Sequence, residues 1–184
     1  MRKSLLLLAS FLTLVGLTAC SSHSSTPDLD GGPAAADAMF AQMMIPHHEQ
    51  AVVMADLAPT RTQNTKILEF AAQIKSAQQP EIDQMSAWLA KWDVARLEGG
   101  EAMAAHGGHG MKGMLTNEQL AELEGSSGAN FDRLFSKLMI EHHLGAIDMA
   151  TQVAGSSDPR VAELAGQIIK MQQLEIELLR AFTS

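Results

Sequence analysis

Apolar residues recur at helical spacing along most of the chain, and no stretch alternates between apolar and polar residues as a half-buried strand would. The pattern predicts four long helices, at about residues 37–57, 65–90, 130–153 and 160–182. A shorter helix is expected at about residues 116–124, with Thr116 as its cap. The second and fourth long helices have seams with alternating steps of four and three residues, which is typical of helices in a bundle. These seams are Ile67, Ala71, Ile74, Gln78, Glu81, Met85, Trp88 and Val161, Ala165, Ile168, Gln172, Glu175, Leu179, Phe182.

One twelve-residue pattern occurs twice, once in each half of the chain. Residues 44–55 and 139–150 both read M-I-x-H-H-x-x-A-x-x-M-A. The similarity extends upstream, where Asp37 corresponds to Asp132. Each copy lies on the first helix of an expected helical hairpin. The sequence therefore predicts an all-α four-helix bundle built from two duplicated hairpins with pseudo-twofold symmetry.

The duplicated pattern places histidines and methionines on one face of each helix. On a helical wheel, His47 points inward, and His48 lies about 100° away at the flank. The second copy repeats this arrangement with His142 inward and His143 at the flank. The candidate metal ligands are His47, His48, Met44 and Met54 in the first copy and His142, His143, Met139 and Met149 in the second. Imidazole and thioether together suit copper, Cu(I) in particular, and carboxylate with imidazole would also accept Cu(II).

The two seams add polar residues at the level of the histidines. Counting back from the expected turns places each inward histidine near a glutamine and a glutamate of the following helix. These further candidates, as ligands or as groups that hold the ligands, are Gln78, Glu81, Gln172 and Glu175, together with Met43. A polar layer in an apolar bundle is costly unless its groups are paired or ligated. It is therefore either a metal site or a hydrogen-bond network in which each glutamate accepts from its histidine.

A glycine-rich segment at about residues 98–117 separates the two halves and carries a second set of soft donors. They are Met103, His106, His109, Met111 and Met114. A flexible cluster of this kind has no core to fill, so an auxiliary copper site is the functional interpretation. An accidental glycine-rich linker is the alternative.

The N-terminal residues read as a targeting segment rather than as part of the fold. Two basic residues precede an apolar run that is short for a membrane span, and the run ends in Leu-Thr-Ala-Cys. This resembles a bacterial lipoprotein signal over residues 1–20, with Cys20 as the lipidated residue. Residues 21–36 then form a flexible tether, and residues 37–184 form one domain. We expect a lipid-anchored protein of the bacterial cell envelope.

Cysteine count and charge exclude several other classes. Cys20 is the only cysteine, so the chain has no intramolecular disulfide and no second thiolate for a metal site. The formal net charge of −8 becomes −10 when Arg2 and Lys3 are removed with the signal, since 11 basic residues then face 21 acidic ones. Such a balance argues against nucleic acid and against an anionic membrane surface. Contact with the membrane is expected through the lipid anchor only.

The motif at residues 44–48, Met-Ile-Pro-His-His, and its second copy resemble a bacterial secreted family called DUF family 305. The likeness covers about residues 37–182 and includes the Met/His-rich middle segment. It implies a ferritin-like four-helix bundle and a location in the envelope. For some members it also implies copper binding and resistance. The resemblance carries over to His47, His48, Met44, Met54 and their counterparts in the second copy.

These observations predict an extracytoplasmic copper-binding protein that buffers copper or passes it to other envelope copper-handling proteins, without catalysis. A ferritin-like di-metal oxidoreductase is the enzyme alternative. It requires Glu-x-x-His, and neither Glu81 nor Glu175 is followed by histidine three residues later. A metal-free interaction module of the envelope is the third hypothesis. It predicts that His47→Ala combined with His142→Ala leaves metal affinity unchanged.

Overall fold

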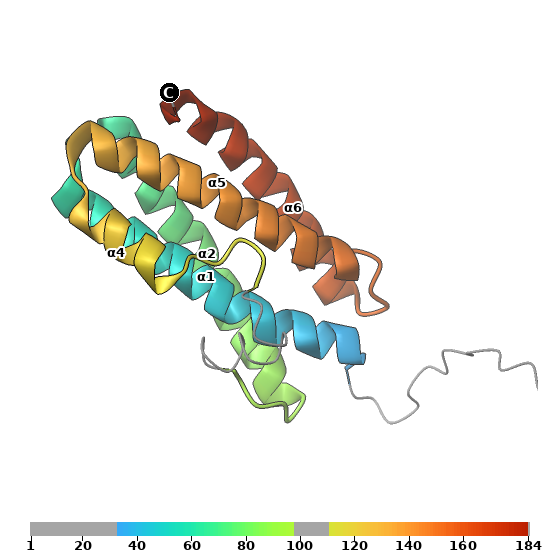
Figure 1. Ribbon diagram of the computed structural model, residues 1–184. Coiled ribbons are helices and arrows are strands. Elements are labelled where there is room, and N and C mark those ends of the chain that lie inside the picture. The colour runs from blue at the N-terminus through green and yellow to red at the C-terminus, as the bar shows by residue number, and fades with distance from the viewer. Residues whose placement is uncertain (1–32, 98–110, 184) are drawn as a thin grey trace, which may run out of the picture. The chain divides into compact units, whose positions relative to one another are not determined.

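The computed structural model describes residues 33–97 and 111–183, and helices dominate both ranges (Figure 1). The four long helices are α1 (Ala35–Arg61), α2 (Thr65–Lys91), α5 (Gly128–Val153) and α6 (Pro159–Leu179). A short helix, α4 (Asn117–Gly125), precedes α5, and a 3-10 turn, η1 (Arg180–Phe182), follows α6. No strand occurs within the described residues. The predicted all-α, ferritin-like bundle of two hairpins is confirmed.

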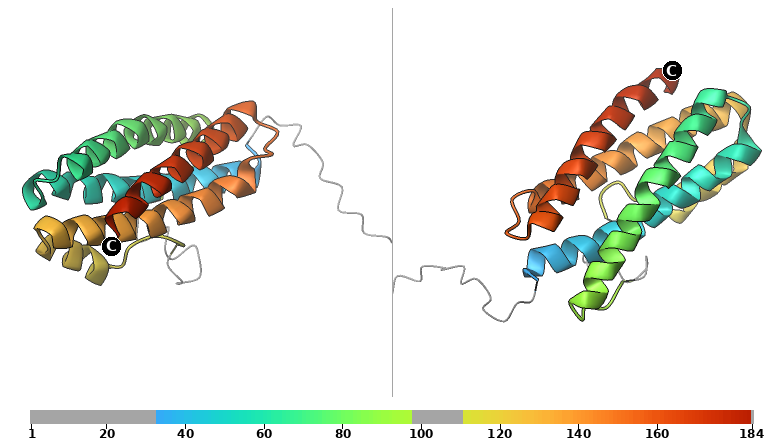
Figure 2. Two further views of the ribbon diagram at one scale, coloured as in Figure 1. Left: turned by 90° about the horizontal axis from the view of Figure 1, so that it is seen from above. Right: turned by 180° about the vertical axis from the view of Figure 1, so that it is seen from behind.

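The hairpins α1–α2 and α5–α6 meet through their first helices. Helix α1 contacts both α2 and α5, and α5 contacts α6 on its other side. Helices α1 and α5 run in opposite directions along each other, with α4 against both of them (Figures 1 and 2). The two helices that carry the duplicated histidines are therefore the central pair of the bundle.

Side-chain caps begin three of the described helices, at Asn64 for α2, Thr116 for α4 and Asp158 for α6. Thr116 begins α4 with a capping box, in which its side chain accepts from the backbone of Gln119 and the Gln119 side chain accepts from the backbone of Thr116. The prediction that α1 ends near residue 57 is wrong, because the helix continues through Pro59 to Arg61. A proline in the last turn removes only one hydrogen bond, and the helix stops where Thr62 turns to an extended conformation.

Two apolar clusters fill the ends of the bundle and leave a polar layer between them. The first cluster joins the start of α1 to the end of α5, and it includes Phe40, Met44, Ile82, Met85, Ala150, Leu164 and Ile168. The second joins the end of α1 to the start of α5, and it includes Met54, Ile67, Ile74, Phe131, Phe135, Met139 and Leu179. The predicted seams face this core, with Glu81 and Phe182 as their half-buried members. The buried polar side chains between the clusters are His47, His48, Gln78, His142, His143, Gln172 and Glu175.

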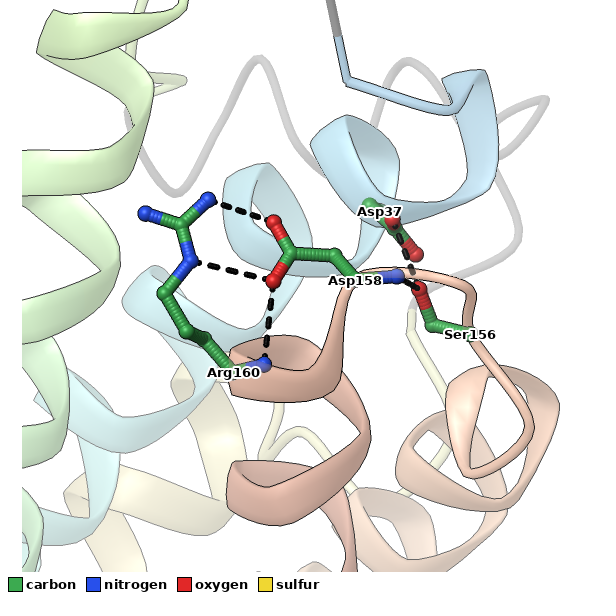
Figure 3. Close-up of polar contacts among 4 residues, drawn as sticks. All are labelled: Asp37, Ser156, Asp158 and Arg160. Carbon is green, nitrogen blue, oxygen red and sulfur yellow. Dashed lines mark hydrogen bonds and ion pairs between the residues drawn. The ribbon is translucent and has the colours of Figure 1, made fainter. Parts of the chain in front are cut away.

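Two corresponding aspartates tie each hairpin to the turn of the other. Oδ2 of Asp37 accepts a hydrogen bond of 2.8 Å from the Ser156 hydroxyl in the α5–α6 turn, and Ser156 accepts from the backbone N–H of Asp158 (Figure 3). Oδ2 of Asp132 accepts from the Asn64 side chain in the α1–α2 turn, at 2.9 Å. The correspondence of Asp37 and Asp132 in the sequence is thus matched by equivalent contacts.

Several predicted features lie outside the described residues. They are the signal segment with Cys20, the tether up to residue 32, and Met103, His106 and His109. Among the helices of residues 33–97 and 111–183, none combines the length and the hydropathy that a bilayer span requires.

Candidate metal centre

The four histidines of the duplicated motif lie in the polar layer at the middle of the bundle, and all four are fully buried. His47 on α1 and His142 on α5 face each other across the contact between these helices. Their ring centroids are 3.8 Å apart, and the rings are inclined by 40°. The expectation that these two histidines point inward agrees with this geometry.

The second histidine of each pair turns toward the other helix of its own hairpin. Nε2 of His48 lies 2.8 Å from Oε2 of Glu81 on α2, in a hydrogen bond. Nε2 of His143 lies 2.7 Å from Oε2 of Glu175 on α6, at ion-pair distance but without hydrogen-bond alignment. The first histidines contact each other, and the second ones contact the glutamates.

One expectation is corrected by these contacts. Glu81 and Glu175 pair with His48 and His143, the fully buried second histidines, rather than with His47 and His142. The reason is that α1 has two neighbours. A rotation of about 100° per residue directs His47 to α5 and His48 to α2. Counting residues along a hairpin predicts the position of a residue along the bundle axis. It does not predict which of the neighbouring helices the side chain contacts.

Several buried ring nitrogens have no hydrogen-bond partner. This is true of Nδ1 in all four histidines and also of Nε2 in His142. The side-chain amide of Gln78 likewise has no partner at either its oxygen or its nitrogen. An unpaired buried polar group costs about 1–3 kcal/mol, so such a concentration in one layer calls for a ligand. A metal ion that accepts imidazole lone pairs would fit these atoms.

Burial keeps the two facing imidazoles neutral. It lowers the pKa of His47 to about 3, with the charge of His48 as the next cause, while the Lys112 carbonyl acts in the opposite direction. Burial, followed by the charge of His47, also lowers the pKa of His142 well below its ordinary value. Imidazole binds metals in the neutral form. Both rings are therefore ready to bind a metal at neutral pH without losing a proton.

A segment before α4, residues 111–115, crosses the site, and we call it the strap. Gln50 on α1 holds it with two hydrogen bonds, because its Oε1 accepts from the Leu115 N–H at 2.7 Å and its Nε2 donates to the Leu115 carbonyl at 3.0 Å. The carbonyl of Lys112 lies 3.3 Å from Nε2 of His47. The strap therefore covers the histidine pair from one side and contacts it directly.

Gly145 on α5 lets the strap approach this closely. A Cβ at this position would lie 1.9 Å from the Lys112 carbonyl oxygen and 3.0 Å from Cα of Gly113. Gly113 has a φ of +85°, and a Cβ there would lie 2.7 Å from the Glu141 carbonyl. In the duplicated motif, Gly145 corresponds to Gln50. The two copies thus differ at this position. In the first copy the Gln50 side chain binds the strap, and in the second copy Gly145 leaves room for the strap backbone.

The predicted methionine ligands separate into three packing environments. Met44 lies in the first apolar cluster, whereas Met54 and Met139 lie in the second, and all three are fully buried. Met43, Met111, Met114 and Met149 form a third group with Leu97, and Met149 also packs against the first cluster. Met111 was expected in a flexible segment without a core, but it is 4% exposed and packs against Met43.

The side chains that are available as ligands limit which metal ions the polar layer can bind. Within residues 33–97 and 111–183, no three side chains of His, Cys, Asp or Glu lie close enough together to hold a metal ion by themselves. The glutamates are turned toward His48 and His143, which leaves the two facing imidazoles as donors. Imidazole nitrogens suit copper among the transition metals and suit calcium and magnesium poorly.

Solved structures of the same architecture give an independent comparison. A DUF305 protein from Streptomyces coelicolor, described as secreted, matches with a TM-score of 0.71 and 30% identity over 78% of this chain and 89% of its own. A DUF305 fragment from Deinococcus radiodurans matches with a TM-score of 0.72 and 28% identity over 83% of this chain and 97% of its own. A comparison with curated proteins found no match.

A third structural relative, CopM, was solved with metal ions. Its Cu(I)-bound form matches with a TM-score of 0.65 and 26% identity over 79% of this chain and 94% of its own. A Cu(II)-bound form of CopM also matches, at 28% identity. The family model for a domain of unknown function, DUF305, matches residues 37–183. This range contains α2, α4, α5 and α6 in full and all of α1 except its first two residues. With that span and this fold, the chain belongs to the DUF305 family.

Proposed function

We propose that this protein binds copper outside the cytoplasm, with Cu(I) as the favoured ion and Cu(II) as a further one, and that it buffers the metal or passes it to another envelope copper-handling protein. One observation carries this proposal. His47 and His142 are neutral, fully buried imidazoles whose rings lie 3.8 Å apart and whose Nδ1 atoms have no partner. The copper-bound forms of CopM, a structural relative, support the choice of metal.

Within this proposal the residues of the layer have different tasks. His47 and His142 would supply the imidazole ligands, and the thioethers of Met44 and Met139, each three residues before one of these histidines, would be the softer donors. His48 and His143 hold the carboxylates of Glu81 and Glu175. These two pairs would therefore fix the surroundings of the ion rather than complete its first set of ligands.

Anaerobic titration with Cu(I) against a competing chelator tests the proposal. Wild type is compared with His47→Ala/His142→Ala, and His106→Ala/His109→Ala serves as a matched control that removes two histidines of the middle segment. We expect the first variant to bind one tightly held Cu(I) ion fewer per chain than wild type, and the control to bind the same number as wild type. An unchanged number of tightly bound Cu(I) ions in His47→Ala/His142→Ala would contradict the assignment. Circular dichroism and thermal unfolding of both variants would show that the helices have formed.

We also propose that Cys20 becomes lipidated and anchors the protein in the envelope. The support is the sequence alone, in which a basic start and a short apolar run lead to Leu-Thr-Ala-Cys. Expression in bacteria with a radiolabelled fatty acid tests this, with Cys20→Ala as the comparison. Label should appear in the wild-type protein and be absent from the variant. An unlabelled wild-type protein would show that the segment is an ordinary secretory signal.

A further inference from the structure

A third group of packed side chains lies beside the polar layer, and we call it the methionine cluster. It consists of Met43 on α1, Met111 and Met114 in the strap and Met149 on α5, with Leu97 as its one other member. Three separate parts of the chain thus bring four thioethers together. The strap contributes two of them, and its hydrogen bonds through Gln50 hold it in place.

The composition of this cluster differs from that of the two apolar clusters. In those, each methionine lies among aliphatic and aromatic side chains, as Met54 does beside Phe131 and Phe135. Methionine commonly fills irregular gaps of such cores. The methionine cluster contains no aromatic residue and a single leucine. Filling space does not require four thioethers at one place, and thioethers are donors that a soft ion prefers.

A cavity reaches the cluster from the surface. It has a volume of about 100 Å³, and Met43 and Met149 line it together with Phe40, Val153 and Gln152. Met39, which is 59% exposed, stands at the same cavity one helical turn before Met43. Met43 itself is only 3% exposed. An ion could therefore pass from an exposed thioether to buried ones.

The side chains that line the cavity and the methionine cluster favour one class of metal ion. Thioethers are neutral, soft donors that favour Cu(I) and similar monovalent ions, whereas calcium and magnesium require oxygen ligands. The carboxylate of Asp148, next to Met149, pairs with Lys112 at 3.4 Å on the exposed side. Gln152 is the polar side chain of the cavity wall. These surroundings do not supply the charge that a hard divalent ion needs.

We propose that Met43, Met111, Met114 and Met149 form a thioether site for a monovalent soft cation, Cu(I) or Ag(I), separate from the histidine pair. The site adjoins that pair, since Met43 lies one turn before His47 on α1 and Met111 precedes Lys112, whose carbonyl contacts His47. The choice of metal rests on the proposed function, but the site has its own ligands.

Titration of the full chain with Ag(I) tests this site, followed by NMR of methionine methyl groups labelled with carbon-13. The methyl signals of Met43, Met111, Met114 and Met149 should shift together in one binding step. The variants Met43→Leu/Met149→Leu and Met111→Leu/Met114→Leu assign these signals and nearly preserve volume. Each should remove that step and reduce the tightly bound Ag(I) by one ion per chain. Met85→Leu/Met171→Leu, which removes two methionines outside the cluster, should leave the step unchanged.

The histidine variant separates this proposal from the previous one. In His47→Ala/His142→Ala the methionine step should persist, even though binding at the histidines is lost. Unchanged methyl signals in the wild-type protein, or unchanged stoichiometry in both leucine variants, would overturn the thioether site. So would the loss of the methionine step in the histidine variant, because the cluster would then not bind independently.

Discussion

A buried imidazole without hydrogen-bond partners reduces the stability of the folded protein, and His142 is the clearest case here. Neither of its ring nitrogens has a hydrogen-bond partner, and its side chain is fully buried. His47 differs, because its Nε2 meets the Lys112 carbonyl. If metal binding explains these side chains, removing the imidazole of His142 should affect stability and metal affinity in opposite directions.

We predict that His142→Leu stabilises the metal-free protein while it weakens Cu(I) binding. Leucine fills a similar volume and leaves no unpaired buried nitrogen, so the free energy of unfolding should rise by about 1–3 kcal/mol. Urea unfolding without metal measures this change. A fall of the same size would mean that the imidazole is held by interactions of the fold itself.

His143→Leu is the matched control for that substitution. Its imidazole lies 2.7 Å from Glu175, whose side chain is 12% exposed. Removing the histidine leaves this carboxylate nearly buried without a partner, which should reduce the free energy of unfolding by about 1–3 kcal/mol. The same substitution at two adjacent positions should thus have opposite effects on stability.

The buried imidazoles also predict how stability depends on pH. The pKa of His47 is about 3 in the folded protein, whereas an unperturbed histidine side chain has a pKa of 6.5, so between these values the unfolded chain binds a proton that the folded one does not. The free energy of unfolding should therefore fall as the pH falls below 6.5, by about 1.4 kcal/mol per pH unit for each such histidine. The lowered pKa of His142 acts in the same direction.

Urea unfolding at about pH 7.5 and about pH 5.5 measures this dependence, with the pH range taken from the linkage between protonation and folding. The wild-type protein should lose more stability between the two pH values than His47→Leu/His142→Leu does. Groups that titrate equally in both proteins cancel in this comparison. Identical losses would show that the two imidazoles are protonated equally in the folded and unfolded states.

At the scale of elements, the strap is the part of the site most sensitive to a single methyl group. Gly145→Ala would place a Cβ 1.9 Å from the Lys112 carbonyl oxygen, so the strap or α5 must move. We expect a loss of about 1–3 kcal/mol in the free energy of unfolding, as is usual for overpacking. Weaker Cu(I) binding should accompany it, because Lys112 then leaves His47.

Gly166→Ala is the control for this prediction, since α6 offers open space there, with nothing within 4 Å of the added Cβ. Alanine at such a helical position should stabilise the protein by about 0.4–1 kcal/mol. Thermal unfolding of both variants provides the measurement. Equal behaviour of Gly145→Ala and Gly166→Ala would show that the strap does not rest against α5.

The elements could be predicted from the sequence where a single helix carries the information. The seams of α2 and α6 face the core as their four-and-three spacing predicts, and Thr116 caps α4. The pairing of His48 with Glu81 could not be predicted in this way, because it depends on which of two neighbouring helices a side chain meets. The strap was missed although one signal was present, namely the difference between Gln50 and Gly145 in otherwise similar copies.

At the scale of the whole molecule, the two hairpins are equivalent in their framework and different at their centre. Asp37 and Asp132 make corresponding contacts to the opposite turns, and each second histidine faces a glutamate of its own hairpin. The strap breaks this symmetry, because it lies across one side of the histidine pair and contacts His47. The 3.8 Å approach of the His47 and His142 rings supports our proposal of one central site for a single ion, rather than two equivalent sites.

Anomalous diffraction at the copper edge, from crystals grown anaerobically with excess Cu(I), would show whether the histidine pair holds the metal. We expect a copper peak between the imidazoles of His47 and His142, within bonding distance of a nitrogen of each ring. Crystals of His47→Leu/His142→Leu should lack that peak while they keep the same fold. Copper bound elsewhere in the wild-type protein, with no peak between these two rings, would show that His47 and His142 do not bind the ion.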